Sequence, residues 1–113
     1  MRVIALDHVQ LAMPKGREQE AREFYQDILG IVEVPKPAEL SGRGGAWFES
    51  GAIKIHLGVE DEFRPAKKAH PAFLISHLNE LLALLISKGY PVTEDKSLSE
   101  VKRAFTQDPF GNR

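Results

Sequence analysis

The residues of this chain best suited to chemistry are its histidines. The chain has four histidines and no cysteine, which excludes disulfides, thiolate metal sites and a cysteine nucleophile. A bound metal would therefore need nitrogen and oxygen ligands. His8 lies on the same side of an alternating segment as Gln10, and His56 lies on the same side as Lys54, in each case the less apolar side. Such imidazoles are either metal ligands or ordinary polar residues that line a wet cavity.

The elements that must position His8 and His56 follow from the spacing of apolar residues in the first half. Alternation predicts strands, and apolar positions three and four apart predict a helix. The predicted elements are a strand over residues 3–13, a helix over 17–29 ended by Gly30, a short strand over 31–34, a loop to Gly45, and a hairpin of strands 46–50 and 53–59 around Gly51. The first half therefore reads βαβββ.

The same order of elements begins again after a charged connector over residues 60–69. The second half is predicted to contain a strand over 70–75, a helix over 78–86 with Ser76 as N-cap and Gly89 as its stop, strands near 90–94 and 101–107, and a turn over 108–112. His70 then matches His8 at an offset of about half the chain, as an internal duplication would give. The strand that should follow the turn is missing from the sequence, which ends at Arg113.

Composition limits the class of protein and of partner. The chain of 113 residues, with 42% hydrophobic and 27% charged residues, fits one globular domain, with one module over about 1–59 and a second over about 70–113. Its 15 basic and 16 acidic residues are spread along the chain, so no nucleic-acid or membrane surface is indicated. The first residues have neither the pattern of a signal peptide nor that of a spanning helix. We expect a cytoplasmic protein with a small-molecule partner.

Several short motifs together resemble one known group of proteins. They are Leu6-Asp7-His8-Val9-Gln10-Leu11, Phe24-Tyr25, Leu29-Gly30-Ile31, Ile55-His56-Leu57-Gly58-Val59-Glu60, Ala69-His70-Pro71-Ala72-Phe73 and Asp108-Pro109-Phe110-Gly111-Asn112-Arg113. In this order, over essentially the entire chain, they resemble the vicinal oxygen chelate superfamily, which includes glyoxalase I, bleomycin-resistance proteins, fosfomycin-resistance transferases and extradiol dioxygenases. The resemblance implies an α+β fold in which two βαβββ modules form a cup-shaped mixed sheet.

The resemblance also implies a site. Its ligand positions fall on His8, His56 and His70, which would hold a divalent ion of zinc, nickel, manganese or iron beside two neighbouring substrate oxygens. The glutamate that relatives carry after the Asp-Pro-x-Gly turn would lie beyond Arg113, so no catalytic residue is assigned. Gln10, Trp47, Arg103 and Phe105 are the predicted substrate-binding residues, although Trp47 and Phe105 are equally suited to a core. His77, at the start of the second helix, is assigned to the surface.

Three classes of function stay open. The histidine triplet favours a metal-dependent lyase, isomerase or dioxygenase that acts on a small oxygenated molecule. A drug-binding protein of the bleomycin-resistance type would use the cup without a metal. A thiol transferase like the fosfomycin-resistance enzymes is the third class, but those relatives usually have a tyrosine where this chain has Phe105. We expect a homodimer, since a missing strand would leave a sheet edge unpaired.

Overall fold

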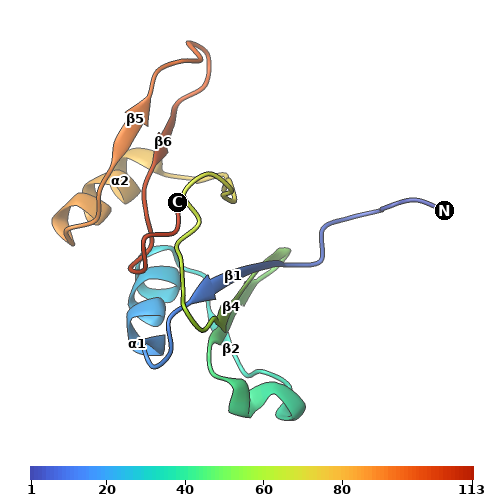
Figure 1. The fold of residues 1–113 in the computed structure, drawn as a ribbon. Helices are drawn as coiled ribbons and strands as arrows, with labels where there is room; N and C mark the ends of the chain where they lie inside the picture. The colour runs from blue at the N-terminus through green and yellow to red at the C-terminus, as the bar shows by residue number, and fades with distance from the viewer. The chain divides into compact units, whose positions relative to one another are not determined.

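The structure is a computed structural model that describes residues 1–113, and the chain forms two compact units (Figure 1). The first unit comprises Met1–Arg64 and the second Pro65–Arg113. Their boundary lies in the charged connector over residues 60–69. Helices and a mixed sheet make the chain an α+β protein, as predicted. No helix has the length and apolar character that crossing a bilayer requires.

The first unit is built on a four-stranded sheet. Its strands are β1 (Val9–Met13), β2 (Glu33–Val34), β3 (Ala46–Ser50) and β4 (Ile53–Val59), in the order β1-β4-β3-β2. β1 runs parallel to β4, whereas β3 is antiparallel to both β4 and β2. The predicted hairpin is confirmed with the same bounds, because its alternating arms and the turn at Gly51 specify a register unambiguously.

One face of this sheet is covered by a helix. The helix comprises α1 (Glu18–Ala21) and a wider continuation, η1 (Arg22–Ile28), and ends before Gly30, whose φ is +77°. Tyr25 on this helix stacks on Phe48 of β3 with ring centroids 5.5 Å apart. The side chains buried on this side are those of an ordinary apolar core: Phe24, Tyr25, Ala46, Phe48, Ile55 and Leu57. Because Gly30 follows the last turn of the helix with a positive φ, it acts as the predicted C-terminal cap.

The first strand is shorter than its sequence pattern predicts. Alternation begins at Val3, but β1 begins at Val9, which pairs with Ile55. The preceding residues extend away from the sheet, and Val3, Ile4 and Leu6 are 91%, 91% and 76% exposed (Figure 1). A strand needs a neighbour as well as an alternating sequence, and within the first unit no strand pairs with residues 3–8.

The second unit contains α2 (Leu78–Ser87) and a two-stranded hairpin, β5 (Thr93–Asp95) with β6 (Arg103–Phe105). The predicted helix and both strands are present, with the strands shorter than expected. The predicted strand over residues 70–75 is wrong, because no strand in this unit pairs with it. Ser76 is also not the N-cap, since that position is taken by His77, which makes no side-chain capping bond.

A tightly bonded turn closes the second unit. The Asp108 carboxylate accepts hydrogen bonds from the backbone N–H groups of Phe110 and Asn112 and from the Asn112 side chain, each at 2.9 Å. The Asn112 side-chain oxygen accepts one from the backbone of Ala66 at 2.9 Å, and the Arg113 N–H donates to the Ala66 carbonyl at 2.8 Å. The predicted turn is therefore present, and it holds the start of the segment that leads to His70.

Candidate metal and substrate site

Three of the predicted site residues form one row across the sheet of the first unit. Gln10 on β1 pairs with His56 on β4, and Trp47 on β3 pairs with the same His56. Neighbours in register share a face of a sheet, and consecutive residues alternate between faces. The row therefore lies on the face opposite Ile55 and Phe48, which pack beneath the helix. The sequence-based assignment of His56 to the less apolar side of its strand is confirmed.

His56 is held between two other rings. It is 4% exposed; the Trp47 ring stacks on it with centroids 3.7 Å apart and planes at 2°, and the His8 ring stacks on it at 4.5 Å and 20°. The Nε2 atom of His56 lies 2.8 Å from a carboxylate oxygen of Glu49. A carboxylate only accepts hydrogen bonds, so Nε2 carries the proton and Nδ1 keeps the lone pair of the neutral ring.

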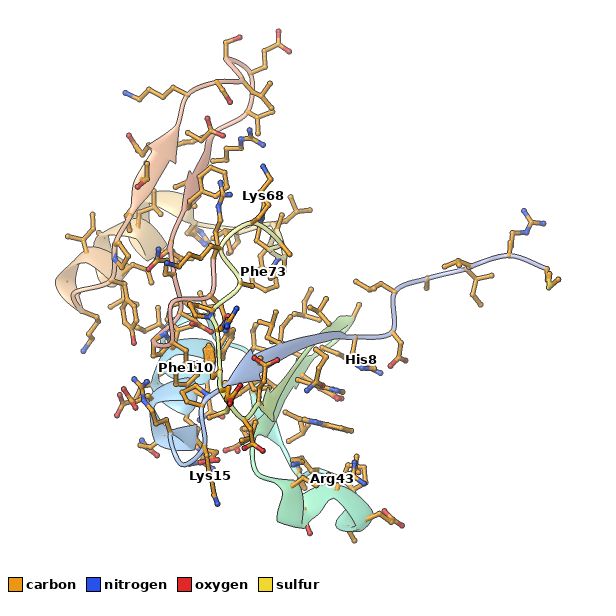
Figure 2. The ribbon with its side chains drawn as sticks, in the orientation of Figure 1. His8, Lys15, Arg43, Lys68, Phe73 and Phe110 are labelled. Carbon is orange, nitrogen blue, oxygen red and sulfur yellow. The ribbon has the colours of Figure 1, made fainter.

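His8 stands at the start of β1, where the extended N-terminal segment leaves the sheet (Figure 2). Its Nδ1 donates a hydrogen bond to the Asp7 carboxylate at 2.8 Å, which leaves the lone pair on Nε2. This bond and the charge of Lys54, 4.0 Å away, hold the pKa of Asp7 below its ordinary value. The adjacent carboxylate thus selects which nitrogen of His8 is free to bind a ligand.

The second unit brings together His70 and Phe105. The His70 ring meets the Phe105 ring edge-on, with centroids 5.8 Å apart. The Nδ1 atom of His70 donates to the Lys68 carbonyl at 2.8 Å, so Nε2 carries the lone pair. The guanidinium of Arg113 lies over the Phe105 ring at 4.1 Å, an arrangement in which the cation is attracted to the ring face.

Arg103, the remaining predicted substrate-binding residue, already has partners. Its guanidinium lies 2.6 Å from the Asp95 carboxylate and 3.3 Å from the Ser97 hydroxyl. It also approaches the Phe105 ring at 6.0 Å. Arg103 is one of the residues that line a hollow of about 450 Å³ at the β5–β6 hairpin. The bonds of Arg103 to Asp95 and Ser97 stabilise the hairpin, whether or not Arg103 also contacts a ligand.

Gln10 lies flat over a glycine of the neighbouring strand. A Cβ atom placed on Gly58 would lie 2.2 Å from Nε2 of Gln10, so a larger residue at position 58 would displace the amide. Gly58 therefore leaves the space in which Gln10 rests on the sheet. The pairing of Ala12 with Gly58 puts both positions on the same face as His56.

The structure therefore groups the predicted residues within each unit. The first unit unites His8, Gln10, Trp47 and His56, and the second unites His70, Arg103 and Phe105. Within neither unit do three histidine, aspartate or glutamate side chains assemble as a metal-binding group. A site that His8, His56 and His70 share stays a prediction.

Sequence reasoning missed Glu49, Asp7 and Arg113, all of which contact predicted site residues. A signal for Glu49 was present: it lies two residues after Trp47 on β3, so alternation puts it on the face of His56. Asp7 lies on the opposite parity from His8 and contacts it only because strand β1 has not yet begun. Arg113 reaches Phe105 through the turn over residues 108–112, whose long-range bond to Ala66 is not visible in the sequence pattern.

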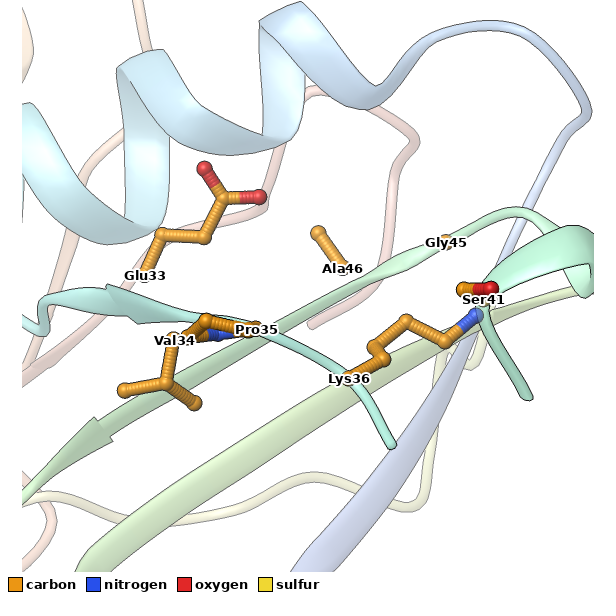
Figure 3. Close-up of a pocket in the computed structure, with 7 residues that line it drawn as sticks. All are labelled: Glu33, Val34, Pro35, Lys36, Ser41, Gly45 and Ala46. Atoms are coloured by element: carbon orange, nitrogen blue, oxygen red, sulfur yellow. The ribbon is translucent and has the colours of Figure 1, made fainter. Parts of the chain in front are cut away.

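A separate groove lies beneath the loop that the sequence predicts before Gly45. This loop contains a short helix, η2 (Ala38–Arg43), and the groove of about 380 Å³ runs between it, β2 and the start of β3 (Figure 3). Its polar groups are engaged: Glu33 pairs with Arg22 at 2.7 Å, and Lys36 donates to the Gly44 carbonyl. None of the predicted site residues lines the groove, so we do not assign it to the site.

Comparison with solved structures identifies similar proteins. A Bacillus anthracis protein assigned to the glyoxalase family is 48% identical, with a TM-score of 0.93, and the match covers 100% of this chain and 93% of that one. The fosfomycin resistance protein FosX of Listeria monocytogenes is 16% identical over 98% of this chain and 89% of its own, with a TM-score of 0.77. For lactoylglutathione lyase of Agrobacterium tumefaciens these values are 19%, 98%, 90% and 0.69. No protein-family model and no curated protein matches the sequence.

Proposed function

Because this chain belongs to the glyoxalase family of the vicinal oxygen chelate superfamily, we propose that it is a metal-dependent enzyme for a small oxygenated substrate. The reaction is of the lyase, isomerase or dioxygenase type, and His8, His56 and His70 are the metal ligands. The 48% sequence identity to the Bacillus anthracis protein supports the family, whereas the similarity to FosX and lactoylglutathione lyase supports the fold alone.

The observation that carries the proposal is the hydrogen bonding of the three histidines. Each ring donates one N–H to an oxygen acceptor: the Asp7 carboxylate for His8, the Glu49 carboxylate for His56 and the Lys68 carbonyl for His70. Metal-binding histidines almost always have such a partner on the nitrogen that does not bind the ion. The donor set therefore fits a divalent zinc, nickel, manganese or iron ion.

When bound, the ion would act as a Lewis acid on the substrate oxygens. Other residues of the chain would orient the histidine rings and contact the substrate. The acceptors Asp7, Glu49 and Lys68 orient the three rings. Gln10, exposed beside His56, offers both an amide donor and an acceptor to a polar substrate. One face of the Trp47 ring lies against His56, so a substrate would contact the other face. A substrate would also contact the ring of Phe105.

We further propose that two copies of the chain associate. The strand order leaves β1 at an edge of the sheet, and the apolar residues Val3, Ile4 and Leu6 precede it in an exposed, extended segment. Edge strands and exposed alternating segments are templates for pairing with another chain. Most soluble oligomers are symmetric assemblies of identical chains, and dimers are the commonest of them, so we propose a second copy of this chain as the partner. We place this dimer in the cytoplasm, as the sequence led us to expect.

A specific observation favours one alternative, a ligand-binding protein without a metal. His56 is 4% exposed and both faces of its ring are covered, as in a polar residue with a structural role. Such a protein would sequester a small molecule in the way the bleomycin-resistance resemblance implies.

Calorimetric titration with nickel, zinc, manganese and ferrous ions distinguishes the two functions. If the proposal is correct, the wild type binds one ion per chain, and His8→Ala and His70→Ala each lose most of the affinity. His77→Ala is the matched control, because His77 is exposed and its ring hydrogen-bonds to the hydroxyl of the adjacent Ser76, at 3.1 Å. Equal affinity of wild type and both variants would contradict the metal site and favour the binding protein.

A further inference from the structure

His56 is restrained more completely than either of the other two candidate ligands. Trp47 and His8 cover the two faces of its ring and fix the ring plane. Glu49 then fixes its orientation within that plane through the 2.8 Å bond to Nε2. His8, in contrast, leaves 41% of its side chain exposed, and His70 is exposed as well.

The bond between Glu49 and His56 is not a by-product of strand pairing. Glu49 is directly opposite Lys54 in the register of β3 and β4, so the nearest opposite charge would be that lysine. Lys54 instead lies 4.0 Å from Asp7, and the Glu49 carboxylate bonds to His56, its diagonal neighbour. The carboxylate is half-buried, with 26% of its side chain exposed, which strengthens its bond to the ring.

We propose that Glu49 is a positioning residue of the site: it holds the Nε2 proton of His56 and thereby makes Nδ1 the atom with which this ring binds its ligand. The part of this inference that concerns a metal rests on the proposed function. The part that concerns the proton does not. His8 and His70 present the opposite nitrogen, Nε2, because their acceptors bond Nδ1. The three candidate ligands are therefore one histidine of one tautomer and two of the other.

Nitrogen-15 NMR of the metal-free protein with labelled histidine tests the proton. In the wild type we expect a slowly exchanging Nε2–H signal for His56 and a lone-pair signal for its Nδ1. In Glu49→Ala the exchange of this proton with water should accelerate by about tenfold or more, because a hydrogen bond to a charged group is lost. Glu49→Gln should restore much of the protection, because the amide oxygen also accepts a hydrogen bond.

Glu94→Ala is the matched control, since Glu94 is an exposed carboxylate on β5 and no histidine bonds to it. It should leave the His56 signals unchanged. Unchanged exchange of the His56 Nε2 proton in Glu49→Ala would overturn the proposal, as would a wild-type ring protonated on Nδ1. Far-ultraviolet circular dichroism and the remaining amide signals identify any variant that fails to fold, and Glu49→Gln then decides the question.

Zinc titration of the same samples tests the ligand atom. Saturation should shift Nδ1 of His56 while its Nε2–H signal persists, and Glu49→Ala should bind zinc about 10- to 100-fold more weakly. Loss of the Nε2–H signal on zinc binding, with Nε2 shifting instead, would overturn the assignment of Nδ1. Absence of any zinc binding by the wild type would instead contradict the proposed function and the metal part of the inference, and the metal-free spectra would still decide whether Glu49 holds the proton.

Discussion

Burial separates the structural role of His56 from that of His8. His56 is 4% exposed and fills the space between two rings, whereas 41% of the His8 side chain is exposed. His56→Ala would remove the middle ring of the stack and leave a cavity beside Trp47. We expect this variant to lose about 2 kcal/mol of unfolding free energy or more, and His8→Ala to lose less than about 1 kcal/mol.

Urea denaturation measures both losses. His56→Phe is a useful companion variant, because it retains a ring between Trp47 and His8 but cannot donate to Glu49. It should be more stable than His56→Ala while still lacking a metal ligand. Equal stability of the His8→Ala and His56→Ala variants would contradict the buried position assigned to His56.

Two glycines lie close to a neighbouring strand: Gly45, just before β3, approaches the backbone of β4, and Gly58 of β4 approaches the Gln10 side chain of β1. A Cβ on Gly45 would lie 2.0 Å from the Leu57 carbonyl oxygen, and the φ of Gly45 is +84°. Gly45→Ala therefore requires the backbone to move and should cost about 3 kcal/mol. A Cβ on Gly58 would meet only the flexible end of Gln10, 2.2 Å away, so Gly58→Ala should cost less than about 1 kcal/mol.

Thermal or urea unfolding of the two glycine variants checks the predicted order. Gly58→Ala should also change the environment of the Gln10 side-chain amide in NMR spectra while the sheet stays intact. A Gly58→Ala variant less stable than Gly45→Ala would show that the close approach at Leu57 does not limit the hairpin.

Acid should loosen the β5–β6 hairpin. Hydrogen bonds from the Ser97 side chain and backbone, and the charge of Arg103, hold the pKa of Asp95 below its ordinary value of 3.8. Because the folded pKa is lowered, the contribution of the ionised carboxylate is fully present above the unfolded pKa. It is lost as the pH falls through the lower, folded pKa.

Carbon-13 NMR of the Asp95 carboxyl group measures this titration directly. We expect a midpoint below 3.8 in the wild type and a higher midpoint in Arg103→Ala, because the favourable charge is removed. The Ser97 amide signal should shift over the same pH range, since it donates to this carboxylate at 2.9 Å. A midpoint at or above 3.8 in the wild type would exclude the predicted stabilisation.

The sequence predicted those elements whose partners are close in the chain. The hairpin of β3 and β4 appeared with the expected bounds, and Gly30 and Gly89 ended the helices, with φ of +77° and +86°. Residues 3–8 and 70–75 were predicted as strand but pair with no strand of their own unit, because pairing depends on a neighbour that the local pattern does not specify. The row of Gln10, His56 and Trp47 was predictable in part, because alternation assigns each side chain to a face of its strand. The bond between Asp7 and His8 was not predictable, because it forms only where β1 has not yet begun.

The exposed apolar residues of the N-terminal segment form the surface that we propose contacts a second copy of the chain. If Val3, Ile4 and Leu6 contact a second copy, Leu6→Glu should weaken the dimer by about tenfold or more, because a charge replaces an apolar side chain that the dimer would bury. Leu98→Glu is the matched control, since Leu98 is also exposed, at 49%, but lies in the β5–β6 hairpin.

Sedimentation equilibrium measures the dimerisation of all three proteins. The wild type and Leu98→Glu should be dimers at micromolar concentration, and Leu6→Glu should dissociate. A wild type that remains monomeric at high micromolar concentration would contradict the dimer, and an unaffected Leu6→Glu dimer would place the interface elsewhere.

The proposed function requires His8, His56 and His70 to bind the same metal ion. X-ray absorption of the zinc- or nickel-loaded protein tests it most directly, because the scattering pattern of imidazole reveals how many histidines coordinate the ion. We expect three imidazole ligands in the wild type, at metal–nitrogen distances of about 2.0–2.1 Å for zinc, two in either His8→Ala or His70→Ala, and three in His77→Ala. A wild-type ion bound by one imidazole or none would contradict it.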